Sequence, residues 1–451
     1  MDYNLILNDI KPTIGEINEI NEISLKIINF LQHLCDESNI KAKVNLVGSV
    51  AKNTALKGKS DIDIFIAFPL DTDKHYLKET GLDLAHKCCA EFNSVPEHHF
   101  ASHPYVTTDI EGYEVDIVPC YSIENGDKIK SAVDRTILHT RFVKKNLAEG
   151  QENEVLLLKR FMAMTGTYGS EFKVGGFAGY LCELLIIKYG TFENTLKSAI
   201  NWQYGHSIDL KEYGTSKLFN DPLIVIDPTD MNRNVAAALR INKLSEFIQS
   251  ARNYLFSNNK KDYFYPLKRN LNKWELINEF KSRNSDIIAI KFNIPDIPLD
   301  TLHPQLKKTT DALERKLNDE GFNVFKADYW SDELLTCVIL LEMASSNLND
   351  IKVNVGPKIF FNKACENFVE KYGRENCYVQ DDFLVHTQKR DVNNAVGLIE
   401  HIFTFEYINL IKVGKNLKKN IINTYEFIDI EEISSDEFLD DFIHPGQHIV
   451  R

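Results

Sequence analysis

The sequence predicts a multidomain protein of the α+β class. Three observations lead to this prediction. The chain has 451 residues, more than a single ordinary hydrophobic core accommodates. Strand-like and helix-like patterns alternate over residues 1–145, helical spacing dominates residues 146–260, and alternation returns over residues 261–451. We therefore expect an α+β domain, a mainly helical central domain, and an α+β C-terminal region.

Composition narrows the class of protein. The net charge of −13 argues against a protein that coats nucleic acid with a broad basic surface, because such binding depends on cationic side chains. It leaves room for an RNA enzyme with a local basic groove. No apolar run approaches the ~20 residues that span a bilayer, and the first residues lack a secretory pattern, so we expect no membrane association. The cysteines form no C-x-x-C pair, which indicates reduced, buried thiols in a cytoplasmic protein without structural zinc.

The first region begins with an amphipathic helix and continues as a small mixed sheet. Apolar residues at three- and four-residue spacing predict helices, and β-branched alternating runs predict strands. The predicted elements are a helix over 12–37, a strand over 43–46, an apolar strand near 61–68, a helix over 76–93, and strands over 101–108 and 113–118, the last ended by Pro119.

The remaining regions follow from the same patterns. In the second region the predicted elements are helices over 155–165, 179–189 and 235–256, with a short strand over 223–226. In the third they are strands over 286–292, 322–327, 334–343 and 377–386, with helices over 301–319, 360–372 and 393–403. This order indicates a small α+β sandwich that binds RNA.

The stretch over residues 47–69 carries the strongest chemical signal. It opens with Gly48-Ser49 and ends with Asp61-Ile62-Asp63 in an apolar, β-branched run. Residues i and i+2 of a strand share a face, so Asp61 and Asp63 are expected side by side. Two neighbouring carboxylates repel each other, and a hard divalent cation such as Mg²⁺ best relieves that repulsion.

An Asp-x-Asp pair alone is weak evidence, because an acidic chain produces copies by chance, as at Asp71 and Asp73. The copy at Asp61 and Asp63 lies on an apolar strand, and the upstream Gly48-Ser49 offers backbone N–H groups to a phosphate. Asp116, on a separate short strand, completes a triad if the two strands are neighbours. Such a triad fits two-metal phosphoryl chemistry, with Asp116 also able to accept a hydroxyl proton.

Several separated blocks resemble the polymerase-β-like nucleotidyltransferases and, more closely, the archaeal class I tRNA CCA-adding enzymes. They occur in family order: Gly48-Ser49 with Lys52, Thr54, Gly58 and Asp61–Asp63; residues 112–121; residues 134–136 with His139; residues 154–159, 168–171 and 176–185; and residues 225–228 through 233–237. The resemblance implies a nucleotidyltransferase palm in residues 1–145, a central domain in 146–260 that holds the nucleotide base and the RNA 3′ end, and a C-terminal body and tail in 261–451 that bind the tRNA acceptor stem.

The resemblance also implies roles for individual residues. The metal-binding and catalytic carboxylates are Asp61, Asp63 and Asp116. The expected nucleotide contacts are Gly48, Ser49 and Lys52 at the phosphates, His139, Lys159 and Tyr168 at the triphosphate and sugar, and Arg233 at the incoming base. The family usually has Arg where this chain has Lys52, which keeps the charge but loses the bidentate fork.

Each of these residues also has an ordinary structural explanation. Alone, His139 is a partly buried histidine, Lys159 a solvated helix lysine, and Tyr168 a packing aromatic. Arg233 alone caps a helix or pairs with Asp230. Only their arrangement around an intact triad favours a nucleotide site.

The basic residues of the third region are weaker signals. Lys412, Lys415 and Lys419 are expected on one helical face, and Lys307 and Lys308 on another helix. Such runs are usually solvated faces, but here they also suit a groove that follows RNA phosphates.

The implied function is template-independent addition of C, C and A to the tRNA 3′ end from CTP and ATP, with Mg²⁺ as cofactor. The alternatives are a poly(A) polymerase or another nucleotidyltransferase with a different acceptor, and a non-catalytic RNA-binding or nucleotide-sensing relative. The sequence leaves the oligomeric state open, with a homodimer as one candidate.

Overall fold

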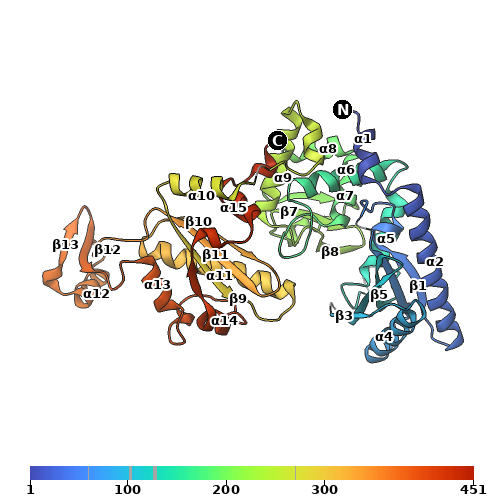
Figure 1. Cartoon of the computed structure of the whole chain (residues 1–451), viewed down its shortest axis with the longest axis horizontal. Coiled ribbons are helices and arrows are strands. Elements are labelled where there is room, and N and C mark those ends of the chain that lie inside the picture. Colours follow the sequence, from blue (N-terminus) through green and yellow to red (C-terminus); the bar gives the residue numbers. More distant parts are fainter. Residues whose placement is uncertain (59, 101–103, 125–128, 270) are drawn as a thin grey trace. The chain divides into compact units, whose positions relative to one another are not determined.

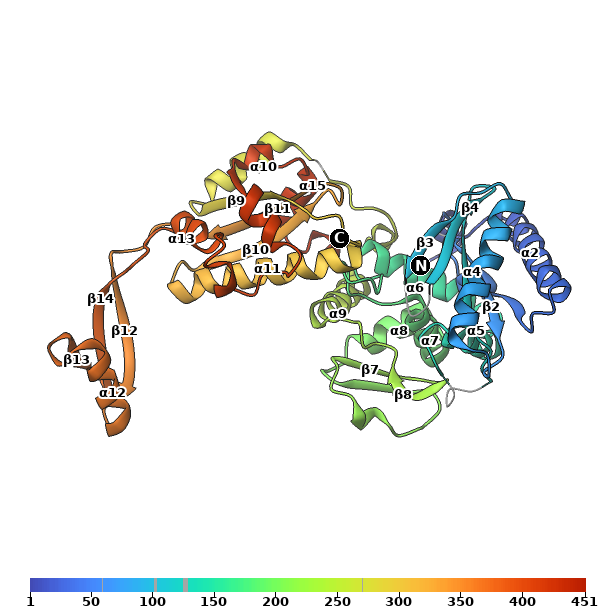
Figure 2. The same ribbon diagram turned by 90° about the horizontal axis from the view of Figure 1, so that it is seen from below.

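The computed structural model describes residues 1–58, 60–100, 104–124, 129–269 and 271–451. The chain divides into two compact units, the first formed by residues 1–268 with 446–451, and the second by residues 269–445. Figure 1 and Figure 2 label the elements of both units. The division of residues 1–260 into two domains at residue 145 stays a prediction.

The first unit begins with a mixed five-stranded sheet in the order β1-β2-β5-β4-β3. Its strands are β1 (Lys43–Val47), β2 (Ile62–Phe68), β3 (Glu97–Phe100), β4 (Pro104–Ile110) and β5 (Tyr113–Tyr121). One face carries the buried Ile62, Ile64 and Ile66 of β2, which pack with side chains of α2 (Ile14–Glu37) and α4 (Lys74–Glu91). The other face carries Phe65 and Ala67 of the same strand. Asp63 lies at the start of this second face because side chains alternate along a strand.

Most predicted elements of this region are confirmed within a few residues, but the predicted end of β5 at Pro119 is wrong. The strand continues to Tyr121 and pairs with β2 along its whole length. Its register with β4 ends at Ile117, so beyond that residue β5 has a strand neighbour on one side only, and a proline is tolerated. Residues 101–103, the start of a predicted strand, lie outside the described residues.

The rest of the first unit is mainly helical. Its helices are α1 (Asn4–Ile10), α3 (Gly48–Ala51), α5 (Arg135–Asn146), α6 (Gln151–Met164), α7 (Gly179–Tyr189), α8 (Phe192–Ala199) and α9 (Ile241–Phe256). The core between these helices is rich in aromatic residues, among them Phe161, Phe177 and Phe247. A three-stranded sheet, β6 (His206–Asp209), β7 (Leu223–Asp227) and β8 (Asp230–Asn234), completes the unit.

The helix predicted over residues 235–256 begins only at Ile241. Residues before it continue the β7–β8 hairpin, since the amide of Val235 donates to the carbonyl of Val225. The amide of Arg240 donates to the carbonyl of Gly175. Tertiary hydrogen bonds therefore override the helix propensity of the alanine-rich run at 236–238.

The second unit is built on a four-stranded antiparallel sheet in the order β10-β11-β9-β15. Its strands are β9 (Asp286–Asn293), β10 (Val324–Ser331), β11 (Thr336–Met343) and β15 (Glu426–Ile428). Side chains of the long helix α11 (Leu299–Glu320) cover one face. The helices α10 (Lys273–Ser282) and α15 (Asp436–Ile443) cover the other face. The remaining helices of the unit are α12 (Asn362–Tyr372), α13 (Ala395–Ile402) and α14 (Lys418–Thr424).

A second, three-stranded sheet projects from this body, as both views show (Figure 1, Figure 2). It consists of β12 (Ile351–Lys358), β13 (Cys377–Gln380) and β14 (Phe383–Lys389). The single strand predicted over 377–386 is therefore wrong, because Asp381 adopts a positive φ and turns the chain into a hairpin. The predicted common helical face of Lys412, Lys415 and Lys419 is also wrong, since α14 begins only at Lys418.

None of the helices in the described part of the chain combines the length and the apolar character that crossing a membrane requires.

Candidate active site

The three candidate carboxylates lie at one end of the five-stranded sheet. Asp63 on β2 stands directly opposite Asp116 on the neighbouring parallel strand β5, and Asp61 immediately precedes β2. The strand adjacency that a triad requires is therefore present. From the other side, the hydroxyl of Thr107 on β4 donates a hydrogen bond of 2.5 Å to Oδ1 of Asp116.

The electrostatics of these carboxylates show how strongly they interact. Burial, together with the charges of Asp116 and Asp61, raises the pKa of Asp63 to about 7. Burial also raises the pKa of Asp116, with the hydrogen bond from Thr107 acting in the opposite direction. Ionised carboxylates in this position are therefore unfavourable until a positive charge joins them.

Gly48 makes close approach to Asp63 possible. Its φ is +72°, and an ideal Cβ at this position would lie 1.8 Å from Oδ2 of Asp63. Any side chain would collide with the carboxylate, so the backbone of Gly48 lies directly against it. This contact explains why glycine occupies position 48.

The donor set fits a hard divalent cation, because it consists of carboxylate oxygens whose charged forms are destabilised by burial and mutual repulsion. Among the described residues no three His, Cys, Asp or Glu side chains already form a group that could hold a metal ion. The carboxylates thus supply the right atoms without a preformed cage.

Two lysines predicted at the nucleotide phosphates meet at one buried carboxylate. Lys52 Nζ lies 2.6 Å from Oε2 of Glu183, and Lys159 Nζ lies 3.7 Å from Oε1. The hydroxyl of Thr54 donates to the same Oε1 at 2.6 Å, and Lys159 donates to the carbonyl of Thr54 at 2.8 Å. Lys159 is 2% exposed, so its interpretation as a solvated helix lysine is wrong.

Tyr168 lies in the loop after α6 and pairs through a β-bridge with Phe177. An ideal Cβ on Gly179 would lie 3.2 Å from the Tyr168 hydroxyl and 3.5 Å from Lys159 Nζ. The two predicted nucleotide residues therefore converge on the start of α7, where the absence of a side chain leaves them room.

A second buried carboxylate, Asp227, organises the remaining predicted residues. His139 Nε2 and Arg233 Nη1 each lie 2.8 Å from its Oδ2. The ring of Tyr180 stacks on His139 with centroids 3.9 Å apart. The predicted alternative pairing of Arg233 with Asp230 is wrong, because Asp230 pairs with Arg135 at 3.1 Å.

The charges in this cluster follow from its hydrogen bonds. Burial alone would raise the pKa of Asp227, but hydrogen bonds from His139 and Thr229 outweigh it and hold the pKa well below the ordinary range. Burial lowers the pKa of His139, so the neutral ring donates from Nε2 to the carboxylate. Asp227 is thus a fixed anion that orients one imidazole and one guanidinium.

Lys52 connects the parts of the site. Its ammonium lies 5.9 Å from the centroid of the Tyr180 ring, which in turn stacks on His139. Its charge also stabilises the ionised form of Asp63. A series of interactions through Lys52, Tyr180 and His139 therefore connects the carboxylates with the cluster that contains Arg233.

Sequence reasoning gave no role to three contributors to this site: Glu183, Asp227 and Thr107. Glu183 and Asp227 lie in blocks that resemble the family, and each is a lone acid in or at the end of an apolar run, which indicates a buried ion pair. Thr107 carries no such signal in the sequence.

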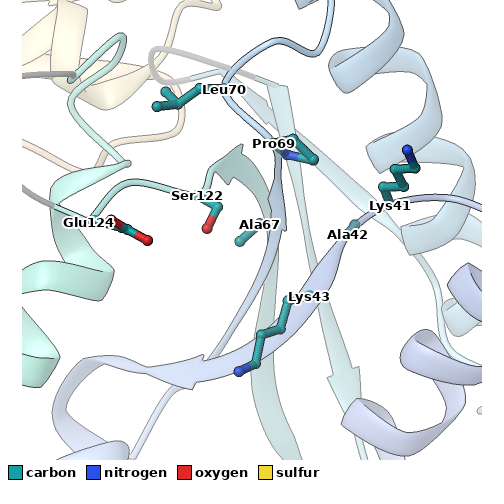
Figure 3. Close-up of a pocket in the computed structure, with 8 residues that line it drawn as sticks. All are labelled: Lys41, Ala42, Lys43, Ala67, Pro69, Leu70, Ser122 and Glu124. Carbon is teal, nitrogen blue, oxygen red and sulfur yellow. The ribbon is translucent and has the colours of Figure 1, made fainter.

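An open cavity at the sheet lies away from these carboxylates. It has a volume of about 500 Å³ and is lined by residues such as Lys43, Ala67 and Ser122 (Figure 3). These residues lie at the start of β1 and the ends of β2 and β5, opposite the end that carries Asp63 and Asp116. We therefore do not place the substrate there.

Comparison with known proteins identifies three matching family models. Residues 27–139 match a nucleotidyltransferase domain, residues 153–265 the second domain of tRNA nucleotidyltransferase, and residues 283–429 the C-terminal domain of CCA-adding enzyme. Among solved structures, a cytoplasmic RNA terminal U-transferase aligns over 59% of this chain and 98% of its own, with 13% identity and a TM-score of 0.47.

Curated relatives match along the whole chain. The CCA-adding enzyme of Methanothermobacter thermautotrophicus is 42% identical over 100% of this chain and 99% of its own. The enzyme of Methanosarcina acetivorans is 37% identical over 95% of this chain and 93% of its own. The enzyme of Methanocaldococcus jannaschii is 35% identical over 88% of this chain and 89% of its own. With this identity along its full length, the chain belongs to the family of CCA-adding enzymes.

Proposed function

We propose that Asp61, Asp63 and Asp116 form the catalytic centre with which this chain adds C, C and A to the tRNA 3′ end. The reaction is template-independent nucleotidyl transfer from CTP and ATP. The observation that supports the assignment most is the juxtaposition of Asp63 and Asp116 on neighbouring strands, directly against Gly48.

In the reaction, the terminal hydroxyl of the RNA attacks the α-phosphate in line, a new P–O bond forms, and the bond to pyrophosphate breaks. Bound Mg²⁺ would supply charge neutralisation at the triphosphate and acidify the attacking hydroxyl, and we propose Asp61, Asp63 and Asp116 as its ligands. We also propose Asp116 as the acceptor of the hydroxyl proton, a role that its raised pKa supports.

The triphosphate is bound by groups on the surrounding elements. The proposed phosphate contacts are the backbone at Gly48 and Ser49 and the ammonium groups of Lys52 and Lys159. Gly48 lies against Asp63, the charge of Lys52 acts on Asp63, and Lys159 shares Glu183 with Lys52. A compact cluster of cations suits a polyanion such as a nucleoside triphosphate. Lys52 binds here as a point charge where the family usually has the fork of Arg.

The remaining substrate contacts are assigned to the Asp227 cluster and to Tyr168, which lies near Lys159 at the start of α7. His139 and Tyr168 are the proposed triphosphate and sugar contacts, and Arg233 the residue that faces the incoming base. Asp227 fixes the orientation of both His139 and Arg233 before substrate enters. Such preorganisation reduces the reorganisation needed when the nucleotide binds.

The second unit is the proposed binding surface for the tRNA acceptor stem. Lys308 on α11 is exposed, whereas Lys307 is paired with Asp311 at 2.5 Å. Duplex RNA is gripped mainly through its backbone and shape, so scattered exposed cations suffice for this role.

The test uses a tRNA that ends at the discriminator base, with Mg²⁺, CTP and ATP. We expect the wild type to extend this tRNA by C, C and A. The variant Asp61→Ala should lose transfer but retain tRNA binding, as measured by filter binding. Transfer by Asp61→Ala at the wild-type rate would remove Asp61 from the centre. Unlimited addition of A to arbitrary RNA would instead indicate a poly(A) polymerase.

We further propose that the enzyme acts as a cytoplasmic homodimer. All eight cysteines are free, which suits a reducing compartment. The edge strand β12 exposes Ile351, Val353 and Val355, and a second copy would cover such a row. Light scattering of the wild type and of Val353→Lys tests this proposal. The wild type should be a dimer and the variant a monomer, and a monomeric wild type would refute the proposal.

A further inference from the structure

Glu183 is a fully buried carboxylate in the middle of α7. Its neighbours from Leu181 to Ile186 are buried as well, and most are apolar. An isolated charge in such surroundings is strongly unfavourable, so the carboxylate must be paired. Its partners are the ammonium groups of Lys52 and Lys159 and the hydroxyl of Thr54.

Among the residues that the structure describes, Glu183 is the carboxylate that Lys159 contacts. Glu183 and the neutral thiol of Cys182 face it from α7, and Lys52 adds a second positive charge. The Tyr168 hydroxyl lies beside it near Gly179. Burial lowers the pKa of Lys159, and the charge of Glu183 acts most strongly in the opposite direction.

We propose that Glu183 is a positioning residue for the nucleoside triphosphate, which keeps Lys159 protonated and holds Lys52 beside it before the nucleotide enters. This inference rests on the proposed assignment of Lys52 and Lys159 to the phosphates. A purely structural ion pair needs one lysine, whereas two lysines around one carboxylate leave a net positive charge for a polyanion. The carboxylate also ties the segment after α3, which carries Lys52, to the α6 helix of Lys159.

The test is the variant Glu183→Gln, which preserves shape but removes the charge. The Michaelis constant for CTP is measured between pH 6.5 and pH 9.5 with a tRNA that ends at the discriminator base. We expect a nearly constant value in the wild type. In the variant it should rise with pH by about tenfold or more, because a deprotonated Lys159 loses its charge-assisted bond to phosphate. The turnover number should change much less.

Three further variants identify the cause. Lys159→Met should raise the Michaelis constant without pH dependence, and Glu183→Gln with Lys159→Met should match it. Glu152→Gln is the matched control, since Glu152 lies in the first turn of the same helix, about two turns before Lys159, and it should behave as the wild type.

The outcomes separate the two proposals. If Lys159→Met leaves the Michaelis constant unchanged, the assignment of Lys159 to the phosphates is wrong, and the inference falls with it. If Lys159→Met raises it but Glu183→Gln keeps the flat wild-type profile, the assignment stands and the role of Glu183 is refuted.

Glu183→Asp covers the case in which Glu183→Gln does not fold. The shorter side chain keeps the charge but withdraws the oxygens that contact Lys52 and Thr54 at 2.6 Å. We expect a pH-independent Michaelis constant that is raised severalfold. A value equal to that of the wild type would overturn the positioning role.

Discussion

Replacement of Asp63 by Asn should make the metal-free enzyme more stable while abolishing its activity. The raised pKa of Asp63, about 7 against an ordinary 3.8, means that the folded protein holds a proton that the unfolded chain releases. As the pH rises from about 4 to 7, the unfolded state is increasingly favoured, and the full destabilisation is present above pH 7. Asn carries no charge, so the variant does not suffer this destabilisation.

The size of the effect follows from the shift. It spans about three pKa units at 1.36 kcal/mol each, which gives an upper limit of about 4 kcal/mol at pH 8. Because solvent reaches part of Asp63, we expect Asp63→Asn to raise the free energy of unfolding by about 2 to 3 kcal/mol at pH 8. At pH 5 only about one unit of the shift is expressed, so the gain should be about 1 kcal/mol or less.

Urea denaturation in the presence of EDTA at pH 5 and pH 8 measures both values. Asp71→Asn, in the exposed second Asp-x-Asp copy, is the matched control and should leave stability unchanged at both pH values. Added Mg²⁺ at pH 8 should stabilise the wild type and narrow its gap to Asp63→Asn. A stability gain that does not increase between pH 5 and pH 8 would refute the reasoning.

Three further substitutions test the site. Gly48→Ala should abolish transfer and lower the stability by about 1–3 kcal/mol, since its Cβ would lie 1.8 Å from the Asp63 carboxylate; normal activity would contradict this contact. Asp227→Ala should lower the free energy of unfolding by about 3–5 kcal/mol, because it leaves Arg233 without its buried partner; urea denaturation measures the loss, and a loss below about 1 kcal/mol would argue against the pairing. Thr107→Val removes the hydrogen bond to Asp116 and should raise the Mg²⁺ concentration needed for half-maximal activity about 10- to 100-fold. A Mg²⁺ titration of activity measures this midpoint, and an unchanged midpoint would contradict the prediction.

Much of the fold was accessible from the sequence because its signals are local. The isoleucine spacing of α2 and the β-branched run of β2 each report the burial of one face, which is a property of the element itself. The hairpin of β13 and β14 was missed because a single residue, Asp381, reverses the chain between two runs of strand-forming residues. The start of α9 was missed because hydrogen bonds to distant backbone, invisible in the local sequence, hold residues 235–240 out of the helix.

The site shows the same division. The sequence indicated Asp116 as a partner of Asp61 and Asp63 on the condition that their strands are neighbours, and the pairing of β2 with β5 meets that condition. It could not show that Lys52 and Lys159 share Glu183, since the first contact joins residues 131 positions apart. Nor could it show that Arg233 pairs with Asp227 although Asp230 is nearer in the sequence, because Arg135 on helix α5 already pairs with Asp230.

The segment 446–451 belongs to the first unit although the whole second unit precedes it in the chain. The Arg451 guanidinium donates to the carbonyls of Met164 at the end of α6 and of Tyr265, and His448 lies against Gly166 in the loop that leads to Tyr168. The second unit is therefore an insertion, anchored by the first unit on both sides. During synthesis, the first unit acquires its last contacts only after the entire second unit has left the ribosome.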